Sequence, residues 1–498
     1  MIDRDGQVCG PGMLDGLWRE GAEFGPLVLQ RSLVSLGLAL PWLAAVMSIA
    51  SEAPQSWAAL GAAASLLAML VLPGLALISA RAAPASALAR GEWRAVGRAW
   101  HQGLVAALLL GLVALAVGAL GATLLRWLGQ PPVVVQAMAP VLFTLSLAVM
   151  ALPASSGTAA TLLCAGRTGS VLGAVGLISL VSLLLLSWPP ADLFGAHADG
   201  QLGVALVAVL MTWLAAVLLA ALAWWQPQHR RFGLRLAFGG LSPRSAHRAG
   251  PSPVSSLCVA LSWWALAMLA GGRDQVALAT LTGLLTLLLP CLVVGQALAA
   301  AMGRRVTLVL VGARKKPGSV GRCGQRCAWL SVLVMFGLIG LTNQAVTLTM
   351  PVWLLPAALS DQILACMPLA LAMVVAQAAC SLWAQGLRSL DQHLQVTLVL
   401  AVSALLSVPL AWALAIPLGA GLMGILAAPA LCTAVSALLL ARWFRHAAGM
   451  VDAKAAYQMR ARAQAVALGW ADTMMVWPGH KAAARPVGMT TARKPGLR

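Results

Sequence analysis

The chain contains 498 residues, of which 60% are hydrophobic and only 9% are charged. No soluble globular domain has this balance, so lipid is the solvent for most of the chain. The net charge is +19, but the basic residues gather in the tails and in alternate loops, which excludes a nucleic-acid-binding face and indicates contact with anionic lipid.

Apolar windows predict an all-α integral membrane protein with twelve transmembrane helices. The segments are too long and too continuous for a β-barrel, and the polar first 25 residues lack the pattern of a signal peptide. The predicted helices cover residues 28–50, 57–80, 102–124, 133–163, 170–188, 201–225, 254–271, 276–302, 328–350, 362–386, 394–416 and 422–441.

The distribution of positive charge predicts how these helices are oriented. Only Arg126 and Arg273 fall in loops that would face outward, and the other basic residues fall on the opposite side. Inner membrane proteins keep basic residues on the cytoplasmic side. We therefore expect a bacterial inner membrane protein with both termini in the cytoplasm.

Polar, turn-rich stretches divide the chain into two lobes of six helices each. The boundary is a loop that combines five arginines with glycine, proline and serine, and residues 442–465 are expected to continue the last helix. The predicted organisation is 1–27 as a cytosolic N-terminal segment, 28–225 as the N-lobe, 226–253 as a cytosolic linker, 254–441 as the C-lobe and 442–498 as a partly disordered cytosolic tail.

Two similar runs lie about 220 residues apart, 161–170 at the end of the fourth helix and 381–390 at the end of the tenth. Because each lobe has six helices, both lobes have one orientation, and a pseudo-two-fold axis should run along the membrane normal. Duplicated bundles of this kind are typical of transporters, since two similar halves can rock around a central site. We expect a monomer that acts on a small molecule.

The second run carries a resemblance to a known family. Leu387, Arg388 and Asp391 stand in a segment that resembles the Leu-Arg-Gly-x-x-Asp signature of the multidrug and toxic compound extrusion (MATE) family. Gly166 and Arg167 take the matching place in the first run. Two further segments are similar to that family, the approach to the third helix at 98–104 and the glycine-rich approach to the last helix at 419–424.

The resemblance implies an exporter, coupled to protons or sodium, that alternates between inward-open and outward-open states. It would carry amphipathic compounds or organic cations. The positions that match the family's acidic residues are Gln377 in the tenth helix, a position near Trp42 in the first and 254–256, which includes Ser255, in the seventh. No cofactor is expected, and the resemblance implies a cation antiporter coupled to protons or sodium. The carboxylates that usually carry such coupling are not found, because none of the 14 acidic residues lies in the middle of a predicted helix.

Polar residues within the predicted helices are the candidate substrate contacts, because burying them without a partner costs several kcal/mol. Gln377 donates and accepts hydrogen bonds but does not titrate, so it would bind substrate or join neighbouring helices. Asn343 and Gln344 would face the same site or cap a kink. Trp42 and Trp263 would offer an aromatic face to substrate or anchor the chain at the membrane interface.

Other residues that often carry chemistry are interpreted as structural. Gln136 and Gln296 are expected to make packing contacts or to lie at the interface. Cys323 and Cys327 share a basic loop but lack a second pair of ligands, so neither zinc nor disulfide bonds are expected. The sequence contains no nucleotide-binding loop and no zinc-protease motif, so we do not expect an enzyme.

Three other functions are weighed against MATE-like export. A flippase for a lipid-linked sugar would need Arg or Lys in its cavity, and none is expected in the middle of a predicted helix. A major facilitator would carry a Gly-x-x-x-Asp-Arg-type signature after the second helix, where residues 81–101 have none. A divergent or non-transporting member of the family stays open, because the usual carboxylates are missing.

Overall fold

The computed structural model describes residues 12–50, 58, 60–67, 71, 93–127, 132–187, 200–225, 251–272, 274–311, 319–349 and 357–467. These residues are helical, apart from short connections, and contain no strand. The helices of the first half are α1 (Gly12–Ala50), α4 (Trp93–Ala119), α5 (Gly121–Trp127), α6 (Pro132–Ser146), α7 (Ala148–Cys164), α8 (Thr168–Ser187) and α10 (Gly200–Trp225). Those of the second half are α13 (Pro251–Gly271), α14 (Gln275–Val311), α15 (Ser319–Thr349), α16 (Ala357–Ser389), α17 (His393–Ala415) and α18 (Gly421–Ala467).

Eleven of these segments are long and apolar enough to cross a membrane. They match the predicted helices except for the second, 57–80, most of which lies outside the described residues. The predicted fourth helix is formed by α6 and α7, which Leu147 separates. The predicted twelve-helix bundle is therefore confirmed for every helix that the structure describes.

The helix ends differ from the apolar windows in a consistent way. α1 begins at Gly12, sixteen residues before the start of the predicted helix at 28–50, and ends at Ala50 as predicted. α14 and α15 likewise extend into 303–327, which the sequence assigns to a loop. A hydropathy window stops where charged residues begin, but backbone hydrogen bonding continues through them. α18 runs without interruption to Ala467, which confirms the predicted continuation of the last helix through 442–465.

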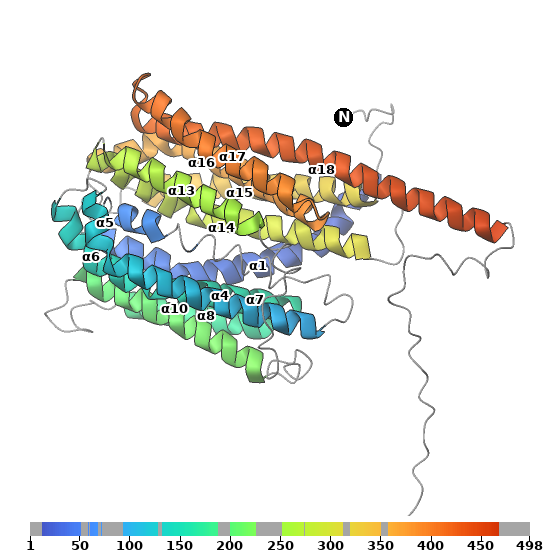
Figure 1. Cartoon of the computed structure of the whole chain (residues 1–498), viewed down its shortest axis with the longest axis horizontal. Coiled ribbons are helices and arrows are strands. Elements are labelled where there is room, and N and C mark those ends of the chain that lie inside the picture. The colour runs from blue at the N-terminus through green and yellow to red at the C-terminus, as the bar shows by residue number, and fades with distance from the viewer. Residues whose placement is uncertain are drawn as a thin grey trace, which may run out of the picture.

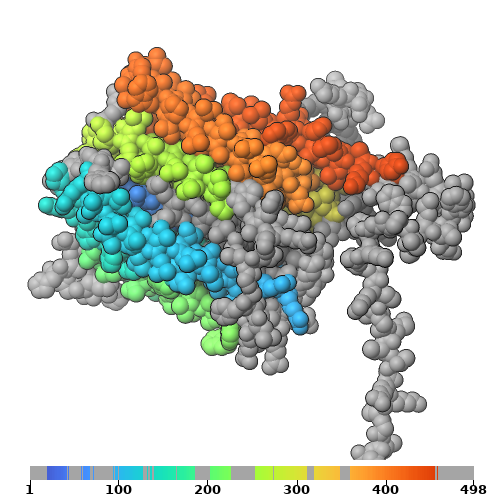
Figure 2. Space-filling model, in the orientation of Figure 1, coloured from blue at the N-terminus to red at the C-terminus, as the bar shows by residue number. Residues whose placement is uncertain are grey.

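The two halves form two layers that lie side by side (Figure 1). In the first half α1 packs against α8, and α7 packs against α4 and α10. In the second half the corresponding pairs are α13 with α17, and α16 with α15 and α18. In the space-filling view the first half, coloured blue to green, forms one side and the second half forms the other (Figure 2). α1 and α14 meet along the boundary between them.

The two repeated runs have one backbone structure. At the end of α7, the amides of Gly166 and Arg167 donate to the carbonyls of Leu163 and Leu162. At the end of α16, the amides of Asp391 and Gln392 donate to the carbonyls of Arg388 and Leu387 in the same pattern. This is the Schellman helix cap. Its left-handed residue is Gly166 in one copy, with φ 79°, and Asp391 in the other, with φ 62°.

The equivalent caps fix the register of the duplication. Gly166 corresponds to Asp391, an offset of 225 residues, whereas matching the sequence runs gives 220. The sequence match is wrong by five positions because it aligned Gly166 with Gly386. Gly386 has another role: a Cβ there would lie 2.9 Å from Met302 Cε and 3.0 Å from the ring of Phe444, so glycine allows α14, α16 and α18 to pack closely.

Candidate functional site: a cavity between the two halves

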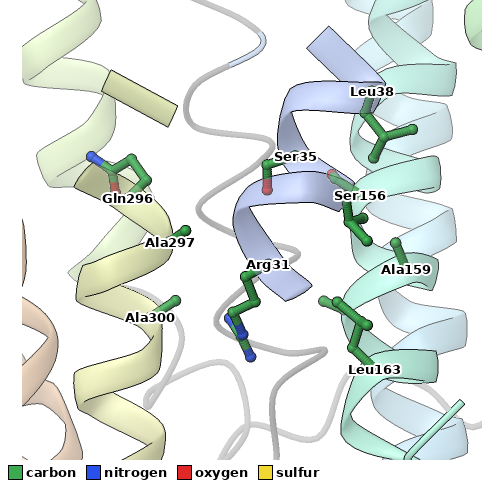
Figure 3. A pocket seen from close by; sticks show the side chains of 11 residues that line it. Arg31, Ser35, Leu38, Ser156, Ala159, Leu163, Gln296, Ala297 and Ala300 are labelled. Carbon is green, nitrogen blue, oxygen red and sulfur yellow. The ribbon is translucent and has the colours of Figure 1, made fainter. Parts of the chain in front are cut away.

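A cavity of about 130 Å³ lies where α1 and α7 of the first half face α14 of the second. Figure 3 shows α1 between the other two helices, with Ala297 and Ala300 of α14 facing α1 and the amide of Gln296 turned away from it. The lining residues are Arg31, Val34, Ser35, Leu38, Ser156, Ala159, Ala160, Leu163, Gln296, Ala297 and Ala300.

Small side chains create this space. α7 contributes Ser156, Ala159 and Ala160, which lie on one face of the helix at spacings of three and four residues. α14 contributes Ala297 and Ala300 on the face that meets α1. Because alanine and serine project only a short distance from the backbone, the helices pass each other without filling the gap.

Four polar side chains lie on an otherwise apolar wall: Arg31, Ser35, Ser156 and Gln296. Arg31 projects from α1 into the space between Ala300 and Leu163 (Figure 3). Gln296 Nε2 on α14 donates a hydrogen bond of 2.9 Å to Ser381 Oγ on α16. No lining residue is acidic. The cavity therefore presents a guanidinium charge to any molecule that occupies it.

The lobes contact each other on both sides of the cavity. On one side Arg305 of α14 pairs with Glu20 of α1 at 2.9 Å and also with Glu23; we call this the ion-pair end. On the other side the helical segment 60–67 packs against α14 at Thr282, which leaves no room for a Cβ at Gly61. Thr282 and Arg305 are separated by roughly 35 Å along α14, and the cavity lies between them.

Gln377, the main predicted contact, is half-buried on α16 and does not line the cavity. It lies one helical turn before Ser381, the partner of Gln296, so both residues are on one face of α16. The structure therefore places Gln377 on the face of α16 that continues from the cavity wall.

The other predicted contacts are dispersed. Asn343 and Gln344 are exposed on α15, away from the cavity lining. Trp263 is half-buried and packs against the main hydrophobic core. Ser255 is buried near the start of α13 and accepts a hydrogen bond of 3.4 Å from the motif residue Arg388. The side chain of Trp42 lies outside the described residues.

The family-motif residues stabilise the bundle rather than line the cavity. Leu387 is buried in the core, and Arg388 connects α16 to α13 through Ser255. Gly166 and Asp391 form the helix caps described above, and Arg167 donates the outer hydrogen bond of the first cap.

The sequence does not predict Arg31 as a lining residue, and it does not predict the ion pair of Glu20 with Arg305. Arg31 was counted at the start of the first helix because the apolar window begins at residue 28, whereas α1 begins sixteen residues earlier. Arg31 lines the cavity from the first turn of the predicted helix, whereas the prediction concerned only the middle of the predicted helices. The packing contact expected of Gln296 is present as its hydrogen bond to Ser381, although Gln296 also lines the cavity. Glu20 and Arg305 are 285 residues apart, and no local pattern relates them.

Comparisons with known proteins agree with this architecture only at the level of structure. The sequence matches no known protein family and no curated protein. Its fold is similar to the eukaryotic MATE transporter AtDTX14, with a TM-score of 0.73 and 15% identity over 88% of this chain and 99% of that chain.

It is also similar to a multidrug resistance MATE family transporter of the MOP superfamily in two conformations. The outward-facing form gives a TM-score of 0.68 and 14% identity over 85% of this chain and 96% of that chain. The inward-facing form gives a TM-score of 0.63 and 14% identity over 84% of this chain and 99% of that chain. The chain is thus a multi-pass membrane protein with the fold of the MATE transporters of the MOP superfamily.

Proposed function

We propose that the chain is a secondary transporter that exports a small amphipathic compound across a bacterial inner membrane by alternating access. The observation that carries this proposal is the cavity between α1, α7 and α14, which has a contact between the lobes on each side. Opening one contact while the other holds would expose the cavity to one side of the membrane at a time. Nothing in this arrangement calls for an enzyme.

The ion-pair end is proposed to face the cytoplasm. Arg304 and Arg305 stand near the end of α14, and Arg322 and Arg326 near the start of α15. The positive-inside rule places such a concentration of basic residues on the cytoplasmic side. Both termini would then be cytoplasmic, and anionic lipid would contact this rim.

The charge of the cavity bears on the class of substrate. An organic cation would meet the guanidinium of Arg31 on a wall that has no acidic lining residue. An amphipathic anion would pair with the guanidinium, which binds carboxylates and phosphates through two parallel hydrogen bonds. Arg31 therefore favours a neutral or anionic amphiphile over an organic cation, and it reopens a lipid-linked anion as a second candidate.

Coupling to protons or sodium requires its own measurement. Among the described residues, the acidic side chains inside the candidate spans are Glu20, Glu23, Asp361 and Asp452, and none lines the cavity. Antiport would therefore act through a group other than the cavity wall. Transport measured with a proton uncoupler, and separately without sodium, distinguishes coupled from uncoupled movement.

The proposal is tested in a host that lacks its own efflux pumps. Accumulation of ethidium, a cation, is compared with that of an anionic amphipathic dye, with and without expression of the chain. We expect lower accumulation of the anionic dye, and unchanged accumulation across a broad panel of dyes would refute the proposal.

Variants connect this activity to the cavity. Arg31→Gln should reduce transport of the anionic dye without lowering membrane abundance. Gln377→Ala should do the same if this amide contacts substrate, whereas reduced abundance would assign it to packing. Gln344→Ala, at an exposed position outside the cavity, is the matched control and should transport normally.

A further inference from the structure

Three potential metal ligands from distant parts of the chain meet at the ion-pair end. Cys323 and Cys327 lie one turn apart on α15, and Glu20 lies on α1. One ligand atom from each lies within 4.8 Å of the other two. Both cysteines are buried, with 3% and 0% of their surface exposed, and the side chain of Glu20 is 14% exposed.

We propose that Glu20, Cys323 and Cys327 bind a thiophilic divalent cation such as Zn²⁺. Residues four apart on a helix present their side chains on one face, so the two thiols converge without distortion of α15. In a tetrahedral zinc site with Zn–S bonds of about 2.3 Å, the sulfur atoms lie about 3.8 Å apart. The spacing of the cluster requires only small side-chain adjustments to reach that geometry.

The charge around the cluster suits an ion of this class. Two thiolates and a carboxylate carry three negative charges, which a divalent ion and the guanidinium of Arg305 together neutralise. Arg305 already holds Glu20 at 2.9 Å through one carboxylate oxygen, which leaves the carboxylate oriented toward the thiols. Hydrogen-bonding partners of this kind fix the direction of a ligand. Soft sulfur ligands favour zinc over magnesium or calcium.

The two cysteines are held rigidly in place. Asp452 of α18 accepts hydrogen bonds from the amides of Val320 at 3.4 Å and Gly321 at 3.3 Å, at the start of α15. Phe444 of α18 packs against Gly324 so closely that a Cβ there would clash with its ring. These contacts hold the first turns of α15 against α18, and a site on packed elements needs little reorganisation.

The sequence does not reveal this site, because the third ligand lies 303 residues before Cys323. Its position suggests regulation. The ion would bridge α1 of the first lobe and α15 of the second, so it would hold the ion-pair end closed. This consequence rests on the proposed function of alternating access, whereas the binding of the ion does not.

The test measures metal binding and leaves transport aside. The purified full-length chain in detergent is stripped with a chelator and titrated with Zn²⁺, and bound metal is measured by mass spectrometry of the elements. A parallel titration with Cd²⁺ follows the ultraviolet charge-transfer absorption of cadmium thiolates. We expect about one ion per chain, held by two thiolates and a carboxylate.

Variants identify the ligands. Cys323→Ser with Cys327→Ser should lower affinity by more than about 100-fold, since even the loss of an outer partner costs about 10-fold to 100-fold. Glu20→Gln should weaken binding and keep the cadmium absorption. Cys366→Ser, at a buried cysteine of α16 outside the cluster, is the matched control and should bind as the unmodified chain does.

Two results would refute the proposed metal site. If the unmodified chain binds no stoichiometric Zn²⁺ or Cd²⁺, the cysteines are apolar packing residues and the proposal is wrong. Equal binding after both cysteines are replaced overturns it as well. If the double variant does not fold, protection of Cys323 and Cys327 from alkylation by Zn²⁺ in the unmodified chain decides, with Cys366 as the internal reference. A chain that binds zinc but transports nothing would refute the proposed function alone.

Discussion

Removing one carboxylate from the ion-pair end should open the cavity from that side. Arg305 pairs with Glu20 and Glu23, but the two acids differ in exposure: the side chain of Glu20 is 14% exposed and that of Glu23 is 61% exposed. Loss of one partner costs about 3–5 kcal/mol for a buried pair and about 0.2–1 kcal/mol for an exposed pair. Because Arg305 keeps one acid in either variant, we take about 2 kcal/mol for Glu20→Gln and about 0.5 kcal/mol for Glu23→Gln.

If the pair exists only while this end is closed, these energies shift the equilibrium toward the open form. An energy of about 2 kcal/mol corresponds to roughly 30-fold, and about 0.5 kcal/mol to roughly two-fold. The assay places a cysteine at Ala300 on the cavity wall and measures its alkylation by an impermeant maleimide in inverted vesicles with a metal chelator. Peptide mass spectrometry separates this cysteine from the native ones.

Comparing the two variants tests whether burial sets the strength of the ion pair. Glu20→Gln should speed alkylation at position 300 by up to about 30-fold, and Glu23→Gln should change it far less. Equal effects of the two variants would show that burial does not set the strength of the contact. Unchanged rates in both would show that the ion pair does not keep this end closed.

The helix caps and the packing of α18 give two further predictions, both measured as the midpoint of thermal unfolding in detergent. Gly166→Ala should destabilise the protein by about 1 kcal/mol, because alanine is strained at a positive φ. Asp391→Gly at the equivalent position should stabilise the protein slightly, because glycine adopts a positive φ at little cost. A stability change of the same sign in both variants would contradict the shared cap. Gly324→Ala should lower the stability by about 1–3 kcal/mol through overpacking against Phe444. Adding Phe444→Leu to that variant should recover part of the lost stability. Unchanged stability in Gly324→Ala alone would show that α18 does not constrain α15.

The sequence predicts the membrane helices and the duplication well, because both depend on local patterns. A run of about 20 apolar residues has few stable structures in lipid except a helix. The glycine-containing run at the end of α7 marks a helix cap for a physical reason, since glycine enters the left-handed region at little cost. At the end of α16 the same position is Asp391. Matching glycine with glycine therefore aligns Gly166 with Gly386 instead.

The candidate site is predicted less well, because it is built from contacts between distant helices. The sequence predicts Gln377 as a substrate contact from its place in one helix. The structure relates Gln377 to the cavity only through Ser381 and Gln296. Arg31 was hidden by the charged residues that precede it, which moved the expected start of the helix. Glu20 meets Cys323 only when the two lobes pack together. Such contacts follow from tertiary packing, which hydropathy and spacing do not encode.

We propose that the cavity between α1, α7 and α14 is the path of the substrate. It is tested most directly by filling the cavity with Ala160→Phe and Ala300→Phe and measuring efflux of the anionic dye. Leu398→Phe, at a position on α17 with 55% exposure, is the control, and gel filtration checks that all three variants fold. The account predicts that the two cavity variants lose efflux while Leu398→Phe keeps it. Folded cavity variants that transport at the unmodified rate would contradict it.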